Sequence, residues 1–300
     1  MKAKTYAAID IGSNGARLLI KRFDDNAPEF DRIKRVLFIR VPLRLGKDVF
    51  TLGKISKERE VMMMHMMKGF KHFMLLNQVD DYRACATAAM RDAENGKKIM
   101  KTIMQETGIK LEIIRGEEEA RLLCNNVIEQ TNSNSGSYAY VDVGGGSTEI
   151  SLLHDGVLAE SHSFNIGTLR MLSGKVTNAT KYQMRGMLDT YAEEFPGAQI
   201  IGSGGNINKL FKLTHNKNDE KVIKVSELKE IYEELAQLNE EERKEKYGLK
   251  DDRVDVIIPA AEIFLMVANG LKCDTIYVPN ISLADSIVDG MYRSQLKKQG

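Results

Sequence analysis

One stretch of this sequence occurs twice in related form. Tyr6–Gly15 (YAAIDIGSNG) resembles Tyr138–Ser147 (YAYVDVGGGS), and the aspartates of the two copies, Asp10 and Asp142, lie 132 residues apart. Each copy has a β-rich run, an aspartate, a turn that contains glycine and a second β-like run, which is the pattern of a hairpin. Because the offset has the size of a domain, the repeat predicts two similar domains and not a solenoid.

Strand-like and helix-like segments alternate along the rest of the chain, which predicts an α/β protein with mixed sheets. We place one domain at residues 1–130 and the other at 131–300, joined by the polar run 131–136, and the last helix is a candidate for packing back onto the first domain. The expected strands are 17–23, 35–40, 82–87, 111–115, 138–143, 149–153, 157–164, 198–202 and 275–278. The expected helices are 56–76, 96–106, 117–126, 181–194, 226–238, 254–269 and 283–296, and one more opens after the turn 203–206.

Composition narrows the class of partner. Hydrophobic residues make up 43% of the 300 residues, so sizeable cores are expected. Lys+Arg is 43 and Asp+Glu is 42, whereas a protein that binds long nucleic acid usually has a basic excess. The sequence shows no signal-peptide pattern and no long apolar run. We therefore expect no nucleic-acid partner, no membrane and a cytoplasmic location.

Three features of the sequence have a purely structural explanation beside a chemical one, and the structural explanation is favoured for each. The cysteines Cys85, Cys124 and Cys273 are widely spaced without a CxxC pair, which favours three buried thiols over a disulfide framework or a zinc site. The run Met62–Met67 (MMMHMM) suggests copper(I) ligands, but consecutive methionines point all round a helix, which favours a flexible core-facing helix. The charged run 240–246 is interpreted as a solvated helix end.

The segment Asp142–Glu149 (DVGGGSTE) is the strongest chemical signal. Its glycines exceed what a hairpin needs, and they let main-chain N–H groups approach an anion with no Cβ in the way. The hydroxyls of Ser147 and Thr148 add donors. Asp142 ends an apolar strand, where an uncompensated carboxylate is costly, and a magnesium ion would compensate it. The alternative is an ordinary glycine-rich hairpin.

Two further glycine turns support an anion site. In the first copy, Ser13 and Asn14 supply donors, and Arg17 could reach a phosphate with both guanidinium nitrogens. The run Gly202–Gly205 (GSGG) opens a helix, where orphan N–H groups and the helix dipole favour an anion. Neither a P-loop nor a dinucleotide-binding fingerprint is present.

The roles of two more segments stay open on the residues alone. The acidic residues of Arg115–Arg121 (RGEEEAR) would suit the positive end of a helix dipole, which is the favoured explanation. Phosphate hydrolysis, however, needs a carboxylate that orients or deprotonates the attacking water. Arg91 follows a strand and is either a surface charge or a phosphate clamp.

Taken together, these motifs resemble the exopolyphosphatase/guanosine pentaphosphate phosphatase (Ppx/GppA) family, within the superfamily of acetate kinase, sugar kinases, Hsp70 and actin. They occur in the family's order over nearly all of the chain. The segments that carry the resemblance are 8–14 (AIDIGSN), 86–91 (ATAAMR) with Asn95, 116–122 (GEEEARL), 141–149 (VDVGGGSTE) and 202–205 (GSGG).

The resemblance implies a fold and a chemistry. The fold is two ribonuclease-H-like (actin-like ATPase) domains with mixed sheets around an interdomain cleft, whose closure would exclude bulk water. The activity is magnesium-dependent removal of the terminal phosphate from a phosphate chain. The family's catalytic glutamate corresponds to Glu119. The resemblance therefore favours a catalytic role for the acidic turn over the helix-dipole explanation. Asp142 and Glu149 match its other acidic positions and would take part in catalysis.

The implied ligand sets follow from the same alignment of motifs. Asp10 faces Asp142 and Glu149 from the first loop, and the three would hold Mg²⁺ and water. Arg91 matches a substrate-binding arginine. The full substrate-binding set is Ser13, Asn14, Arg17, Arg91, Gly144, Gly145, Gly146, Ser147, Thr148, Gly204 and Gly205.

Departures from the family pattern bear on the substrate and not on the chemistry. Gly15 stands where serine is frequent, and Asn206 where threonine is common. Long members carry further helical domains, including an HD-like one, that help to hold long polyphosphate. At 300 residues this chain is expected to be a short member, and some short members prefer shorter polyphosphates or nucleotides.

The resulting prediction is an exopolyphosphatase that acts on inorganic polyphosphate. The nearest alternative is hydrolysis of the 5′-phosphate of guanosine pentaphosphate, so a phosphorylated guanosine nucleotide is the second candidate partner. A kinase of the same superfamily and a non-catalytic polyphosphate sensor are more distant alternatives. The family's habit suggests a homodimer without fixing the oligomeric state.

Overall fold

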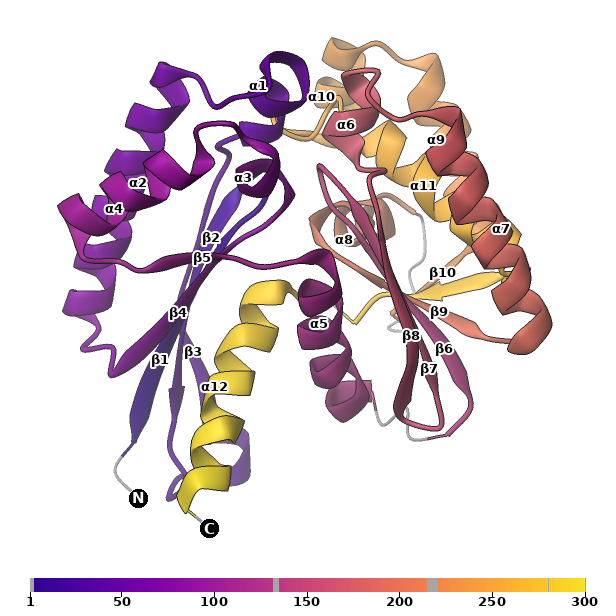
Figure 1. Ribbon diagram of the computed structural model, residues 1–300. Helices are drawn as coiled ribbons and strands as arrows, with labels where there is room; N and C mark the ends of the chain where they lie inside the picture. Colours follow the sequence, from indigo (N-terminus) through magenta and orange to yellow (C-terminus); the bar gives the residue numbers. More distant parts are fainter. Residues whose placement is uncertain (1–2, 132–134, 215–220, 280, 300) are drawn as a thin grey trace. The chain divides into compact units, whose positions relative to one another are not determined.

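The computed structural model describes residues 3–131, 135–214, 221–279 and 281–299 (Figure 1). The chain divides into two compact units, Met1–Arg115 with Leu283–Gly300, and Gly116–Ser282. The division therefore falls one helix before the expected position at 130/131, and the last helix belongs to the first unit. Much of the polar connection predicted at 131–136 lies outside the described residues.

The first unit is built on a mixed sheet with the strand order β3-β2-β1-β4-β5. Strands β1 to β3 form an antiparallel meander, and β4 and β5 run parallel to β1. The strands are β1 (Lys4–Ile11), β2 (Ala16–Phe23), β3 (Ile33–Val41), β4 (Asp81–Ala86) and β5 (Leu111–Ile113). The helices are the 3-10 turn η1 (Glu29–Asp31), α1 (Leu45–Leu52), α2 (Lys57–Leu76), α3 (Ala88–Asp92), α4 (Gly96–Thr107) and α12 (Leu283–Gln299).

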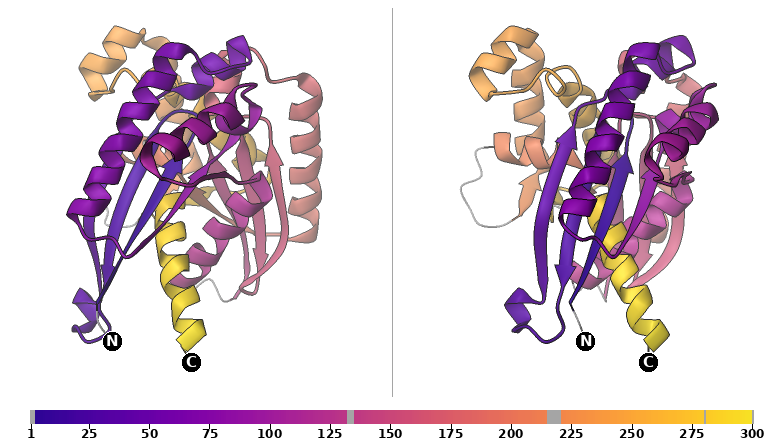
Figure 2. Two further views of the ribbon diagram at one scale, coloured as in Figure 1. Left: turned by 60° about the vertical axis from the view of Figure 1, so that its left-hand side comes forward. Right: turned by 90° about the vertical axis from the view of Figure 1, so that its left-hand side faces the viewer.

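Helices cover both faces of this sheet. All side chains of β1 from Tyr6 to Ile11 are buried, although successive side chains of a strand point to opposite faces. Helices α2 and α4 pack together on one face, and α12 contacts β1, β2 and β4 on the other (Figures 1 and 2). The methionines of α2 behave as expected of a core-facing helix, because Met63, Met66 and Met67 are buried while Met62 is exposed.

The second unit has the mixed sheet β10-β11-β9-β6-β7-β8. Its strands are β6 (Ser137–Val143), β7 (Thr148–His154), β8 (Val157–Phe164), β9 (Gln199–Ser203), β10 (Val222–Lys224) and β11 (Thr275–Tyr277). Its helices are α5 (Gly116–Thr131), α6 (Thr168–Leu172), α7 (Asn178–Glu194), α8 (Gly205–Leu213), α9 (Val225–Gln237), α10 (Glu240–Tyr247) and α11 (Ile257–Gly270). The apolar α11 lies at the centre of the core and contacts α6, α7, α8 and α9, while α5 packs on β7 and β8.

The two units share one topology. The order β3-β2-β1-β4-β5 corresponds strand for strand to β8-β7-β6-β9-β11, with the same antiparallel and parallel pairs, and β10 is an added edge strand. The predicted α/β class with mixed sheets is confirmed, and the sequence repeat marks equivalent hairpins. Among the described residues, no helix has both the length and the apolar character needed to cross a membrane.

The segments that the sequence did not predict are short. Helices α1, α3 and α6 and strand β10 have three to eight residues, too few to show a periodic pattern. The charged run 240–246 forms α10, in which no residue is buried, as expected of a solvated helix. Cys85 is buried and Cys273 is partly buried, both as free thiols. Burial raises the pKa of both, to about 11 for Cys273.

Candidate functional site

The two repeated hairpins have the same turn. In the first, the N–H of Gly12 donates to the carbonyl of Gly15 at 3.0 Å, and in the second the N–H of Gly144 donates to that of Ser147 at 3.0 Å. In register, Asp10 pairs with Arg17 across β1 and β2, and Asp142 pairs with Glu149 across β6 and β7. The repeat therefore places an aspartate–arginine pair in one unit and a pair of carboxylates at the equivalent position of the other.

Helix α6 fixes the orientation of the glycine loop in the second unit. The first N–H groups of α6 donate to the loop, from Thr168 to the carbonyl of Gly144 at 3.0 Å and from Leu169 to that of Gly145 at 2.8 Å. Since C=O and N–H of one trans peptide point in opposite directions, the N–H groups of the next residues, Gly145 and Gly146, point away from α6. Successive N–H groups with this orientation are able to bind an anion.

Arg170 holds the next peptide of this loop. Its Nε donates to the carbonyl of Gly146 at 2.7 Å, so the N–H of Ser147 points away from Arg170. Thr148 differs from the preceding residues of the loop. Its side chain is fully buried, and its hydroxyl donates to the carbonyl of Ile166 at 2.6 Å. That geometry does not support Thr148 as a hydroxyl donor to a substrate and gives it a role in holding the loop.

The first loop repeats the arrangement with α1 in place of α6. The N–H of Gly46 donates to the carbonyl of Ser13 at 2.8 Å, and the N–H of Arg44 donates to that of Asn14 at 3.0 Å. The N–H groups of Asn14 and Gly15 consequently point away from α1. Ser13 is 3% exposed, so its side chain is packed within the loop.

An acidic cluster forms in the second unit. Glu119, Asp142 and Glu149 each offer one carboxylate oxygen, and these oxygens lie within 4.8 Å of one another. Glu149 is 1% exposed and Glu119 is 8% exposed. Such close carboxylates repel one another unless a cation or protons compensate them. An all-oxygen donor set of this kind fits a hard divalent cation such as Mg²⁺ or Mn²⁺.

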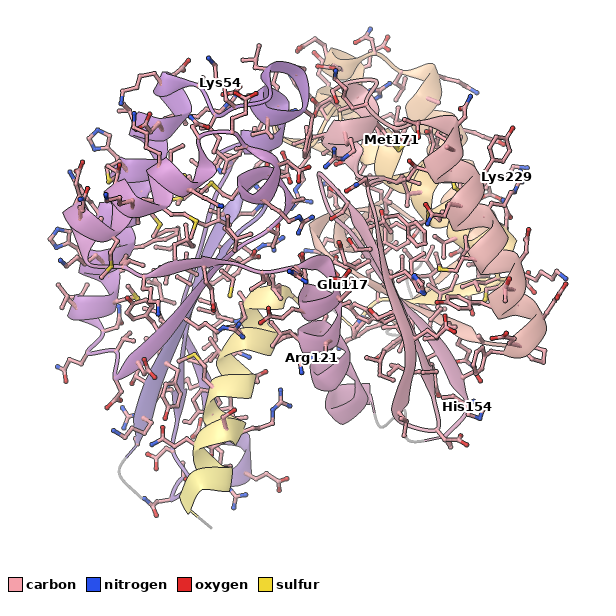
Figure 3. All side chains as sticks on the ribbon, viewed as in Figure 1. Lys54, Glu117, Arg121, His154, Met171 and Lys229 are labelled. Carbon is pink, nitrogen blue, oxygen red and sulfur yellow. The ribbon has the colours of Figure 1, made fainter. Side chains whose placement is uncertain are left out.

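The start of α5 brings Glu119 to the two strand carboxylates. Glu117 lies in the first turn of α5 and Arg121 one turn further along (Figure 3). Glu117 and Arg121 are exposed, whereas Glu119 is buried, so Glu119 is on the inner face of the helix. The acidic turn does satisfy the dipole preference, but one of its members is turned inward to the cluster.

The third glycine turn, Gly202–Gly205, lies beside Asp142. Ser203 pairs with Asp142 across β9 and β6, and Gly204 adopts φ of 97°, where a side chain is strained. A Cβ on Gly204 would lie 2.7 Å from Oδ1 of Asp142. Arg253 contacts Gly205, donating from Nη1 to its carbonyl. These glycines therefore make room for Asp142 and Arg253.

The first unit holds the remaining predicted residues. Nη1 of Arg17 donates to Oδ2 of Asp10 at 2.7 Å, so the carboxylate predicted to bind metal is ion-paired within its own hairpin. Arg91 is partly exposed at the end of α3, and its Nη1 donates to the carbonyl of Ile114 at 3.3 Å. Among the described residues, the acidic cluster of the second unit includes two of the predicted metal ligands, Asp142 and Glu149.

Three polar residues at the site were not singled out from the sequence. Ser163 donates to Glu149, and Arg170 and Arg253 bind carbonyls of the glycine turns. None belongs to a recognisable motif. Only the run of three consecutive polar residues, Ser161, His162 and Ser163, in β8 indicated a strand face that is not apolar.

Fold and site define the class: an α/β protein of two repeated units, with a carboxylate cluster next to glycine loops. The model of the Ppx/GppA phosphatase family matches residues 20–295, and the chain belongs to this family. The structure resembles that of an Aquifex aeolicus family member, with a TM-score of 0.76, 25% identity and 99% coverage of both chains. The predicted family and its actin-like ATPase type of fold are thereby confirmed.

Other relatives differ in name and length. An exopolyphosphatase from Cytophaga hutchinsonii has the same fold, with a TM-score of 0.83, 22% identity and coverage of 97% and 98%. A guanosine-5′-triphosphate,3′-diphosphate pyrophosphatase of Aliivibrio fischeri strain MJ11 is 24% identical over 314 residues, which cover 97% of this chain and 61% of the relative. The chain thus spans about three fifths of the length of that curated relative.

Proposed function

We propose that this protein is a Mg²⁺-dependent phosphohydrolase that removes the terminal phosphate of inorganic polyphosphate. The observation that carries the proposal is the convergence of Glu119, Asp142 and Glu149 in the second unit. The oriented loop beside them supports it, because N–H groups of that loop suit phosphate oxygens. Membership in a phosphatase family supports the same chemistry.

Each carboxylate has a role in this proposal. Asp142 and Glu149 would hold the cation, with Glu119 as the base that orients and deprotonates the attacking water. A bound Mg²⁺ supplies positive charge against the phosphate oxygens and the leaving group. Water oxygen bonds to the terminal phosphorus, the bridging P–O bond breaks, the water proton passes to Glu119, and the bridging oxygen leaves with the shortened chain.

The loops and arginines would hold the substrate. In the second unit, the N–H groups of Gly145, Gly146 and Ser147 are the candidate phosphate donors, with Gly144 as the hinge of the turn. In the first unit, Asn14 and Gly15 supply such N–H groups and Arg17 supplies a guanidinium oriented by Asp10. We therefore propose Asp10 as the residue that orients Arg17 in place of a direct metal ligand. Arg91 remains a candidate phosphate contact.

A second candidate substrate is guanosine pentaphosphate, at its 5′-phosphate. The observation that favours it is the name of the Aliivibrio fischeri relative. The chemistry at the phosphorus would be the same, so the second candidate differs only in what the protein holds beyond the terminal phosphates.

One assay separates the candidates. Orthophosphate release is measured with Mg²⁺ on short polyphosphate, long polyphosphate, guanosine pentaphosphate and ATP. We expect the highest kcat/KM on polyphosphate. A higher value on guanosine pentaphosphate would establish the second candidate, and no release from any of the four would refute a hydrolase.

A further inference from the structure

Glu149 is held by two hydroxyls at one oxygen. Ser147 Oγ donates to Oε1 of Glu149 at 2.7 Å, and Ser163 Oγ donates to the same oxygen at 2.8 Å. Ser147 precedes Glu149 on the chain, whereas Ser163 faces it from the neighbouring strand β8. The two donors thus approach from different elements and orient the carboxylate plane, turning Oε2 away from both serines.

We propose that Ser163 is a positioning residue of the acidic cluster, which fixes Glu149 for binding of a divalent cation. The inference rests on the proposed function only in its assignment of Glu149 to cation binding. Groups behind a metal ligand commonly fix its orientation, and their loss weakens metal affinity or activity by about 10- to 100-fold.

The strand register places Ser163 for this role. Ser203, Asp142, Glu149 and Ser163 are successive partners across β9, β6, β7 and β8. Directly opposite residues project to the same face of a sheet and are close enough to interact. Ser163 therefore ends a row whose middle members are two of the three clustered carboxylates.

Ser163 also contacts the helix that carries the third carboxylate. A Cβ on Gly116, the first residue of α5, would lie 2.3 Å from both Cβ and Oγ of Ser163 and 3.5 Å from Oε1 of Glu149. The absence of a side chain at Gly116 lets α5 start directly against Ser163. Glu119 follows within the first turn, so Ser163 contacts both Glu149 and the start of the helix that carries Glu119.

A neighbouring serine provides a matched control. Ser161 lies two residues earlier on β8, and its hydroxyl forms a hydrogen bond of 2.9 Å with that of Ser151. Ser161→Ala therefore removes the same atom from the same strand and breaks a hydrogen bond that does not involve the cluster.

The test measures binding of Mn²⁺ alone to the full chain by calorimetry, without substrate. For Ser163→Ala we expect about a tenfold weaker Mn²⁺ affinity, whereas Ser161→Ala should bind like the wild type. With polyphosphate, Ser163→Ala should lower kcat about tenfold or more with little change in KM. Equal Mn²⁺ affinity in Ser163→Ala and the wild type would overturn the proposal.

A second variant tests the proposal if Ser163→Ala does not fold. Ser163→Cys keeps a side-chain donor, the weaker S–H, in a slightly larger side chain, so its Mn²⁺ affinity should fall between those of the wild type and a tenfold loss. Wild-type affinity in folded Ser163→Cys would also overturn the positioning role. If the wild type releases no phosphate from any substrate while Ser163→Ala still weakens Mn²⁺ binding, the positioning role stands and the proposed function fails.

Discussion

At the scale of single residues, the glycine loop of the second unit depends on the absence of a side chain at Gly167. Gly167 directly precedes α6, and a Cβ there would lie 2.4 Å from the carbonyl carbon of Gly146 and 2.5 Å from the nitrogen of Ser147. These are backbone atoms and cannot rotate aside. The chain itself therefore approaches one side of the glycine loop closely, at Gly167.

We predict that Gly167→Ala displaces the loop. Overpacking of this kind costs about 1–3 kcal/mol of stability, and displaced N–H donors should lower phosphate release by about 100-fold. Urea unfolding and the phosphate assay measure the two effects. Gly186→Ala in α7 is the control, because a Cβ there meets no atom within 4 Å, and it should retain full activity. Full activity in Gly167→Ala as well would show that the loop does not depend on this contact.

At the scale of elements, a buried aspartate joins α1 to α2. Oδ2 of Asp48 accepts from the N–H of Ser56 at 3.0 Å, and its Oδ1 accepts from Nε of Arg59 at 2.8 Å. Burial alone would raise the pKa of Asp48, but the hydrogen bonds from Ser56 and Arg59 outweigh it and lower the pKa. The charged carboxylate therefore stabilises the junction that leads from the first loop into α2.

The sign of this pKa shift fixes a pH dependence. Because the folded-state pKa lies below the unfolded value near 3.8, the stabilisation is complete at neutral pH and is lost as pH falls through the folded pKa. The free energy of unfolding of Asp48→Asn should be about 1–3 kcal/mol lower than that of the wild type at pH 7. This difference should shrink below about pH 4. Urea titrations of both proteins from pH 7 to pH 3 measure it, and a difference that does not change with pH would contradict the assignment.

At the scale of the whole molecule, the end of the chain completes the first unit. Lys21 is buried on β2, with Nζ 3.0 Å from Oδ1 of Asp285 and 2.9 Å from Oδ1 of Asp289 on α12. On the same helix, Tyr292 stacks on Phe23 with ring centroids 4.2 Å apart. The first unit thus needs residues from both ends of the sequence.

We predict that Lys21→Met destabilises the first unit by about 3 kcal/mol, because it removes the buried cation that Asp285 and Asp289 share, although Asp285 keeps its ion pair with Arg35. Lys4→Met, which removes an exposed ion pair with Asp80, should change stability little. Unfolding monitored by hydrogen exchange would show a loss of protection in β1, β2 and α12. Equal protection in the two variants would show that the buried ion pairs do not hold α12.

Repeated loops and elements with a periodic hydrophobic pattern could be predicted from the sequence. Side-chain contacts that depend on strand register could not. The repeated loops and the long helices and strands were visible, and the family resemblance pointed to Glu119 as the catalytic carboxylate. Ser163 and Arg170 could not be found, because their partners lie 14 and 24 residues away in sequence and meet them only through pairing of β7 with β8 and docking of α6. The pairing of Asp10 with Arg17 likewise depended on the hairpin register.

The central claim is that the cluster of Glu119, Asp142 and Glu149 directs water onto a terminal phosphorus. Hydrolysis of polyphosphate in ¹⁸O-labelled water, followed by mass spectrometry of the products, tests it most directly, with Glu119→Gln as the paired variant. We predict that the wild type places one ¹⁸O in each released orthophosphate and none in the remaining chain, and that Glu119→Gln releases almost none. Label in the remaining chain, or wild-type release by Glu119→Gln, would contradict the account.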